Sequence, residues 1–351
     1  VGDIIDTRTG RVASFKTMME DLAGVRIVYV GETHNSAEDH QVQLEILKAL
    51  HSGSTGPVLA MEMFPRELQP VLDRYWQGTT TEQEFLKEVD WENTWGYPFQ
   101  LYRGLFAFAR ENRLRIVGLN APREVVSQVA KGGLASLSPE NRKRLARDFH
   151  LDNTEHRESV KAEFDGHLRE HIKDFDTFFE AQLSWEETMA ETLAETVKSL
   201  PRGEQVLVIV GKGHIGNKVG VPMLTAERVK APYRTVAPMP FDYPSGLDDP
   251  DLGDYVWVRD RSEGPHHRGR LGVMIRPADS GEGLEVLHVS PQSSAAKAGI
   301  QKGDLIRAID AAPIKDVDDL HRAIAQKDTP IHELTVRRGG KDLKITVTIG
   351  E

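Results

Sequence analysis

Short runs of continuous apolar residues alternate with amphipathic stretches along the first two thirds of the chain. The apolar runs are rich in β-branched residues and lie at residues 25–30, 58–63, 114–119, 206–210 and 234–237. The stretches with helical spacing or helix-start signals lie at residues 36–50, 65–76, 99–111 and 157–199. Continuous apolar strands separated by helices are typical of a parallel sheet that is covered on both faces. We therefore predict an α/β domain with a mostly parallel sheet and helices on both faces.

A long helical block spans residues 139–199. Apolar residues recur on one of its faces from Phe164 to Leu193, and Gln182 and Glu186 lie on the same stripe. A mostly apolar stripe packs against another element. The block therefore predicts a helical subdomain beside the sheet.

The pattern changes after two loop-rich segments, at residues 238–246 and 261–269. Short alternating strands then follow, with one helix at residues 317–325 and a hairpin at residues 333–349. We place a boundary near residue 262. Residues 1–262 would form the α/β domain, and residues 268–351 a second, mainly-β domain.

Composition narrows the possible functions. The 351 residues carry a net charge of −10, which disfavours a nucleic-acid partner because phosphate binding needs a basic surface. No run approaches the roughly 18 apolar residues of a spanning helix, and the absence of Cys excludes disulfides and thiolate metal sites. The first residue is Val1 rather than Met, which leaves room for a removed leader. We expect membrane association only through a lipid anchor outside this sequence.

Polar residues follow four of the predicted strands, at the point where each strand ends. They are Glu32 and His34, then Glu62, then Asn120 and Arg123, and last His214. The carboxyl ends of parallel strands share one edge of a sheet, so we expect these side chains to converge. Imidazole and carboxylate suit either a divalent metal or the activation of water by a general base. The alternative is that each of these residues has only a structural role. Asn120 and Arg123, for example, could close the turn between a strand and a helix.

The same motifs resemble the ChaN-like haem-binding family of the Tiki/TraB superfamily. The resemblance covers about residues 3–258 and rests on Gly31-Glu32-Thr33-His34, Glu62-Met63, Asn120-Ala121-Pro122-Arg123, Gly211-Lys212-Gly213-His214 and the helix at 181–190. It implies an α/β fold with a helical subdomain and a protein that binds haem in iron uptake or handling. It also implies a location in the bacterial cell envelope, as a periplasmic protein or a membrane-anchored lipoprotein, and a possible homodimer.

The wider superfamily includes metal-dependent proteases and esterases, so the resemblance also implies an alternative function. In a metal-dependent hydrolase, the catalytic residues would be Glu32, His34, Glu62 and His214. Of these, His34, Glu62 and His214 would bind the divalent metal. We favour haem binding without enzymatic activity because the motifs match the haem-binding branch most closely, and the question of an enzyme stays open.

Tyr or His typically ligates the iron of haem in uptake proteins. Tyr97 and Tyr102 lie in an aromatic segment, and His167 and His171 are one helical turn apart, so that they could face the same ligand. These four residues are our candidate haem ligands, and Asn120 and Arg123 are further candidates for contact with the cofactor. The alternative is that the aromatic residues are core and that the histidines are incidental on a solvated helix.

Residues 268–350 strongly resemble a PDZ domain of the permuted kind found in bacterial envelope proteases. The resemblance implies that a C-terminal peptide adds a strand to a sheet edge. The residues expected at this peptide site are Leu271, Gly272, Val273, Met274, Leu320 and Ile324. The alternative is that these side chains are plain core and that the domain only packs against a neighbour. A third interpretation of the whole chain is a non-enzymatic PDZ scaffold.

Overall fold

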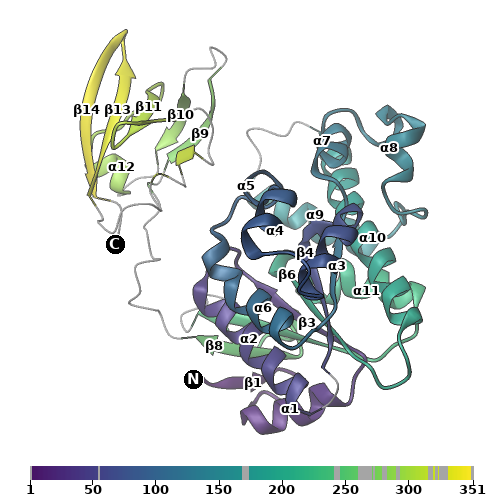
Figure 1. The fold of residues 1–351 in the computed structure, drawn as a ribbon. Coiled ribbons are helices and arrows are strands. Elements are labelled where there is room, and N and C mark those ends of the chain that lie inside the picture. The colour runs from purple at the N-terminus through teal and green to yellow at the C-terminus, as the bar shows by residue number, and fades with distance from the viewer. Residues whose placement is uncertain are drawn as a thin grey trace. The chain divides into compact units, whose positions relative to one another are not determined.

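The chain divides into two compact units, Val1–Arg261 and Ser262–Glu351. The computed structural model describes residues 2–53, 56–167, 174–240, 246–259, 271, 273–278, 283–289, 293–314, 319–320, 323 and 331–348. In Figure 1 the first unit is a sheet between helices and the second unit is mainly β.

An eight-stranded sheet forms the centre of the first unit, in the order β2-β1-β8-β7-β3-β6-β4-β5. The strands are β1 (Ile4–Asp6), β2 (Arg11–Ala13), β3 (Ile27–Glu32), β4 (Val58–Pro65), β5 (Ile116–Asn120), β6 (Val206–Gly211), β7 (Tyr233–Pro240) and β8 (Tyr255–Arg259). Strands β3 to β8 all pair in parallel, whereas β1 pairs antiparallel with β8 and with β2. The prediction of a mostly parallel sheet is therefore confirmed.

Helices cover both faces of this sheet (Figure 1). Along β3, Val28 and Val30 pack into one core cluster, while Ile27 and Tyr29 pack into another, because successive strand residues point to opposite faces. The first cluster draws on α1 (Phe15–Ala23), α2 (Ala37–Ser52), α3 (Gln69–Trp76), α4 (Glu82–Glu88), α5 (Trp91–Thr94) and α6 (Phe99–Glu111). The second draws on α10 (Phe175–Ser199) and α11 (Val221–Arg228). The unbroken apolar strands are explained by burial on both sides.

The block at residues 139–199 contains more than one helix. Its helices are α8 (Pro139–Lys143), α9 (Thr154–His167) and α10, and it follows α7 (Arg123–Gly132). Single 3₁₀ turns in this unit are η1 (Arg66–Leu68), η2 (Leu134–Ser136), η3 (Lys212–His214), η4 (Gly216–Lys218) and η5 (Pro250–Leu252). Across the described parts of the chain, no helix combines the length and the apolar character needed to cross a membrane.

Strand β5 lies at the edge of the sheet, where unpaired backbone groups need partners. The Gln69 side chain supplies two of them. Its Nε2 donates to the carbonyl of Ile116 at 2.8 Å, and its Oε1 accepts from the backbone N–H of Gly118 at 3.1 Å. One amide side chain thus takes the place of a neighbouring strand.

The second unit is a six-stranded antiparallel sheet with the order β14-β13-β11-β10-β9, to which β12 adds beside β11. Its elements are β9 (Val273–Pro277), β10 (Leu284–Val289), α12 (Ser294–Lys297), β11 (Leu305–Ile309), β12 (Ala312–Pro313), β13 (Ile331–Arg338) and β14 (Lys341–Thr348). The predicted C-terminal hairpin is present as β13 and β14. Leu271 and Leu320, two of the predicted peptide-site residues, are buried in the core of this unit.

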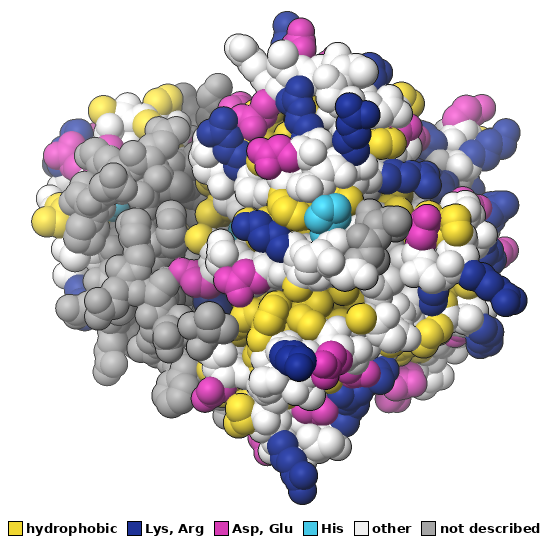
Figure 2. Space-filling model, turned by 60° about the horizontal axis from the view of Figure 1, so that its bottom comes forward, with side chains coloured by type: hydrophobic (Ala, Val, Ile, Leu, Met, Phe, Trp, Pro, Cys, Tyr) yellow, Lys and Arg dark blue, Asp and Glu magenta, His cyan; other side chains and the backbone are white. Residues whose placement is uncertain are grey.

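The surface carries charges of both signs around small apolar patches on the face shown in Figure 2. In the described ranges, the large hydrophobic side chains that are exposed are Val12, Phe15, Leu151 and Ile331. Val12 lies on β2, Phe15 on α1 and Ile331 on β13, while Leu151 lies in a turn. Scattered apolar side chains of this kind are normal on a protein surface.

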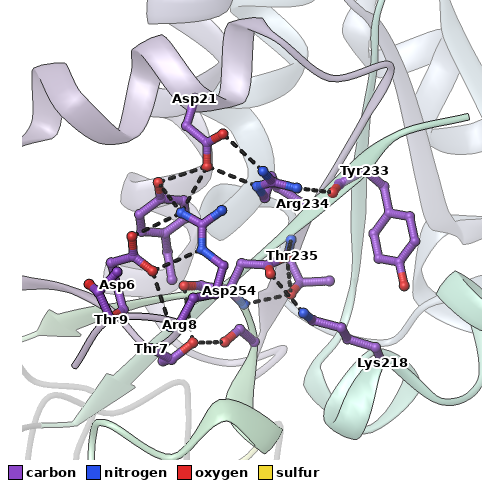
Figure 3. Close-up of polar contacts among 12 residues, drawn as sticks. Asp6, Thr7, Arg8, Thr9, Asp21, Lys218, Tyr233, Arg234, Thr235 and Asp254 are labelled. Atoms are coloured by element: carbon purple, nitrogen blue, oxygen red, sulfur yellow. Dashed lines mark hydrogen bonds and ion pairs between the residues drawn. The ribbon is translucent and has the colours of Figure 1, made fainter. Parts of the chain in front are cut away.

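A polar network ties the N-terminal segment to the amino ends of β7 and β8 (Figure 3). Asp21 of α1 accepts two hydrogen bonds from Arg234, at 2.8 and 3.0 Å, and one from the Tyr255 hydroxyl at 2.8 Å. Arg8 lies 3.0 Å from the same carboxylate. Burial alone would raise the pKa of Asp21, but the hydrogen bonds from Arg234 and Tyr255 bring it down to about 2.

Replacing Asp21→Asn should lower the free energy of unfolding by about 1–3 kcal/mol at pH 7, because two guanidinium groups lose an ionised acceptor. The pKa of Asp21 is lower in the folded protein than its usual 3.8. Its stabilising effect is therefore present above pH 4 and is lost as the pH falls toward 2. Urea unfolding of wild type and variant should show a difference that shrinks over this range.

The matched control is Glu20→Gln, one residue earlier, because Glu20 is exposed and lies 3.8 Å from Lys16. It should change stability by less than about 0.5 kcal/mol. Equal effects of the two substitutions, or no pH dependence for Asp21→Asn, would contradict the role given to Asp21.

Candidate functional site

The carboxyl ends of three adjacent strands bring the predicted acids and histidines together. Glu32 is the last residue of β3, Glu62 lies near the end of β4, and Gly211 ends β6 just before His214. Strand β6 lies between β3 and β4 in the sheet, and Glu32 is in register with Gly211. The parallel topology therefore gathers residues that are far apart in the sequence at one edge.

The imidazole of His34 is held from behind by a buried carboxylate. Its Nδ1 lies 2.8 Å from Oε1 of Glu32, whose side chain is only 1% exposed, while the side chain of His34 is 28% exposed. Tyr102 donates to the same carboxylate at 2.7 Å, and Gln43 donates to its other oxygen at 2.8 Å. His40 lies 3.4 Å from that second oxygen. These contacts fix Glu32, which in turn fixes the ring of His34.

His214 lies between two buried carboxylates. Its Nδ1 is 2.8 Å from Oε1 of Glu186, on α10, and its Nε2 is 3.3 Å from Oε1 of Glu62. The other oxygen of Glu62 accepts the backbone N–H of Gly211 at 2.6 Å. Both predicted histidines thus have Nδ1 anchored by an acid.

Gly211 leaves the space in which these groups meet. A Cβ atom at this position would lie 3.0 Å from Cε1 of His34 and 3.5 Å from Oε2 of Glu62. His34 therefore packs over the end of β6, close to Glu62. The glycine in the Gly211-Lys212-Gly213-His214 motif has a steric reason, since any side chain would crowd the ring.

Asp39 joins the two turns that carry the histidines. Its carboxylate accepts the backbone N–H of Thr33 at 2.7 Å and the amine of Lys212 at 2.7 Å, and Arg259 lies 2.9 Å away. Asp39 is fully buried. It thereby holds the residue before His34 to the residue that begins η3, which carries His214.

The charges of the cluster follow from these contacts. Burial alone would raise the pKa of Glu62 and of Glu32, but the neighbouring histidines outweigh burial and lower both pKa values. Burial would likewise lower the pKa of His214, yet Glu62 and Glu186 raise it well above its usual value. The pKa of His34 is raised because Glu32 and Glu62 outweigh burial. The two carboxylates therefore favour the protonated form of His214.

The sequence predicts a divalent metal on His34, Glu62 and His214, and the structure gives that prediction no support. Within the described ranges, no group of three or more His, Asp or Glu side chains is placed to hold a metal ion. The physical reason lies in the pairing: the carboxylate of Glu62 already contacts Nε2 of His214, and Nδ1 of both histidines faces an acid.

Of the other predicted site residues in this unit, Tyr97 and Tyr102 contact the cluster, and Asn120 and Arg123 bond to backbone groups elsewhere. Asn120 accepts the N–H of Ala121 at 2.8 Å, and Arg123 is exposed and donates to the carbonyl of Asn93 at 3.3 Å. Tyr102 is fully buried and uses its hydroxyl on Glu32. Tyr97 is half-buried, with its ring centroid 5.1 Å from that of His34.

Some predicted residues lie outside the described residues. These are His171, Gly272 and Ile324, together with the side chains of His167 and Met274. Their proposed roles as haem ligands or peptide contacts stay predictions. Val273 is described and lies half-buried on β9.

Three residues at the site, Glu186, His156 and Gln182, were not predicted from the sequence to belong to it. Glu186 contacts His214 directly, His156 contacts Glu186, and Gln182 lies one helical turn before Glu186 on α10. One signal was present in the sequence: Gln182 and Glu186 lie four residues apart on a mostly apolar helical stripe. Polar residues on a packed face need partners, so they indicate a second polar element facing them.

Two family models match this chain. A family model described as haem-binding uptake, Tiki superfamily, ChaN matches residues 18–224, and a PDZ model matches residues 269–349. The chain belongs to the ChaN family. The resemblance predicted from the four strand-end motifs is thus confirmed, and the ChaN region is followed by a PDZ domain. The ChaN match includes Glu32, His34, Glu62 and His214.

A solved structure supports the ChaN fold. It is described as "Cofacial heme binding to ChaN of Campylobacter jejuni", is 22% identical in sequence, and superposes with a TM-score of 0.57 over 73% of this chain and 95% of that chain. At this level of identity the likeness establishes the fold alone.

Two curated relatives match parts of the chain. Protein RETICULATA-RELATED 5, chloroplastic, of Arabidopsis thaliana is 30% identical over 135 residues, which are 36% of this chain and 18% of that protein. A probable periplasmic serine endoprotease DegP-like of Rhizobium meliloti (strain 1021) is 37% identical over 99 residues, which are 25% of this chain and 20% of that protein. The chain thus spans about a fifth of the length of these relatives.

Proposed function

We propose that the ChaN unit binds haem as cargo for iron uptake or handling in the bacterial cell envelope, and that the PDZ unit docks the C-terminus of a partner protein. Membership of the haem-binding ChaN family over residues 18–224 carries the haem proposal. The solved Campylobacter jejuni structure, which is described as cofacial heme binding to ChaN, supports it. The name of the Rhizobium meliloti relative, a periplasmic endoprotease, supports the envelope location.

Residues beside the strand-end cluster fit a flat aromatic ligand. Trp95 and Tyr97 pack around the half-exposed ring of His34, with ring centroids 4.7 and 5.1 Å from it. Bound haem would supply an iron that oxygen or nitrogen donors such as Tyr or His can hold. Tyr102 is fully buried, whereas Tyr97 is half-buried and its ring lies beside that of His34. We therefore assign Tyr97, rather than Tyr102, as the tyrosine that would hold haem.

A titration of the full chain with haem tests this proposal. We expect a Soret band that saturates near stoichiometry. Tyr97→Phe should change the spectrum and weaken binding at least tenfold, about 1.4 kcal/mol, because the iron loses an oxygen ligand. The matched control is Tyr233→Phe. Tyr233 is also half-buried, but it begins β7 and therefore lies at the amino ends of the parallel strands, away from the carboxyl ends that carry the cluster. It should bind haem like the wild type.

A flat titration would contradict haem binding, and an unchanged Tyr97→Phe complex would contradict the assignment of Tyr97.

The hydrolase alternative is the second candidate function. It is favoured by one observation: buried carboxylates anchor Nδ1 of both His34 and His214, an arrangement that orients imidazoles for proton transfer. Hydrolysis of a model ester or peptide that His34→Ala abolishes, in a protein without a Soret band, would support this candidate instead.

The PDZ proposal makes a separate prediction about the peptide terminus. C-terminal peptides selected by display against the full chain should bind with a free carboxylate. The amidated form of the same peptide should bind at least tenfold more weakly, because backbone N–H groups lose a charged acceptor. Fluorescence polarisation measures both affinities. Equal affinity of the two forms, or no enrichment of any terminal motif, would contradict docking by the C-terminus.

A further inference from the structure

The strand-end cluster continues into the helical block through a buried acid. Glu186 of α10 is 2% exposed, and its Oε1 lies 2.8 Å from Nδ1 of His214. Gln182, one turn earlier, donates to the same oxygen at 2.9 Å and lies 3.2 Å from the same ring nitrogen. The back of the His214 ring is therefore held by α10.

A second histidine holds the other side of this acid. His156 of α9 is 1% exposed, and its Nε2 lies 2.5 Å from Oε2 of Glu186. The ring of His156 packs edge-on against Phe179, with centroids 5.6 Å apart. His156, Glu186, His214 and Glu62 thus form one continuous series of acid–imidazole contacts from α9 to the end of β4.

The backbone is shaped to admit this contact. Gly220 has a φ of +79°, and a Cβ atom there would lie 3.1 Å from Oε1 of Glu186 and 2.8 Å from the carbonyl of His214. A glycine is therefore required both for the conformation and for the close approach of Glu186. Burying an acid and an imidazole is costly unless they are paired, so a core that needed only packing would favour apolar residues here.

We propose that Glu186 and His156 are positioning residues that hold the His214 imidazole with its Nε2 directed at Glu62, so that the helical block is part of the strand-end site. His156 acts on His214 through Glu186, without touching it. The inference concerns the geometry of the site and holds for either haem handling or hydrolysis. The result of the haem titration therefore neither supports nor contradicts this proposal.

The chain offers a close control one residue further along α10. Glu187 is fully buried, and its Oε1 lies 2.9 Å from Nδ1 of His150. Its Oε2 lies 2.6 Å from Arg228. Glu186→Gln and Glu187→Gln therefore each alter a buried acid on α10 that contacts an imidazole, but only Glu186 contacts His214.

Long-range ¹H–¹⁵N spectra of the full, haem-free chain labelled at histidine nitrogens test the proposal. The ring signals of His214 are assigned by their loss in His214→Gln. Glu186→Gln should move the Nδ1 signal of His214 by more than its linewidth. His156→Leu should move the same signal, although His156 contacts Glu186 and not His214 itself, and His156→Gln should restore it because the amide of Gln can donate to Glu186. Glu187→Gln should move the signals of His150 and leave those of His214.

Unchanged His214 signals in folded Glu186→Gln and His156→Leu proteins would overturn the proposal, as would an equal shift of His214 in Glu187→Gln. Thermal melting identifies variants that do not fold. Should Glu186→Gln fail to fold, the comparison of His156→Leu with His156→Gln decides. A His214 signal that moves in His156→Leu and returns in His156→Gln supports positioning, and one that moves alike in both contradicts it.

Discussion

Buried carboxylates at the ends of two parallel strands and on the helix beside them are the constraint on which this structure depends. Glu32, Glu62 and Glu186 are each at least 94% buried, and an isolated buried carboxylate is too costly for a folded protein to carry. Each is met by an imidazole: His34 for Glu32, and His214 for both Glu62 and Glu186. Breaking a buried pair by removing one partner costs about 3–5 kcal/mol. Acids and histidines in this cluster therefore have to be considered together.

The fold supplies what this pairing needs. Adjacent parallel strands bring Glu32, Glu62 and Gly211 to one edge, and Asp39 fixes the two turns that carry the histidines. Gly211 and Gly220 leave room where a Cβ atom would collide with the cluster. The helical block closes the arrangement from the other side through Glu186. The half-exposed ring of His34 is where the cluster reaches the surface, and it is also where Trp95 and Tyr97 gather.

Much of this arrangement could be predicted from the sequence, because apolar runs in a parallel sheet are explicit in the residue pattern. The convergence of Glu32, His34, Glu62 and His214 follows from the rule that strand ends share an edge. The rest depended on tertiary contacts. The start of α10 at Phe175, where the side chain of Asp174 caps the helix, was not visible in a helical stripe that runs through it. Helix periodicity predicted that α10 packs, but not that Glu186 would face a histidine from another element. The prediction of a metal site rested on the presence of suitable ligand residues, whereas the structure shows these residues already paired with one another.

The interaction free energy between the side chains of Glu62 and His214 tests this account most directly. A double-mutant cycle of Glu62→Gln, His214→Gln and the double variant, by urea unfolding at pH 7, isolates the energy of their interaction. The account predicts a favourable coupling of about 1 kcal/mol or more, because the imidazole of His214 and the carboxylate of Glu62 meet in a buried site. Additive effects of the two substitutions, with a coupling near zero, would contradict it.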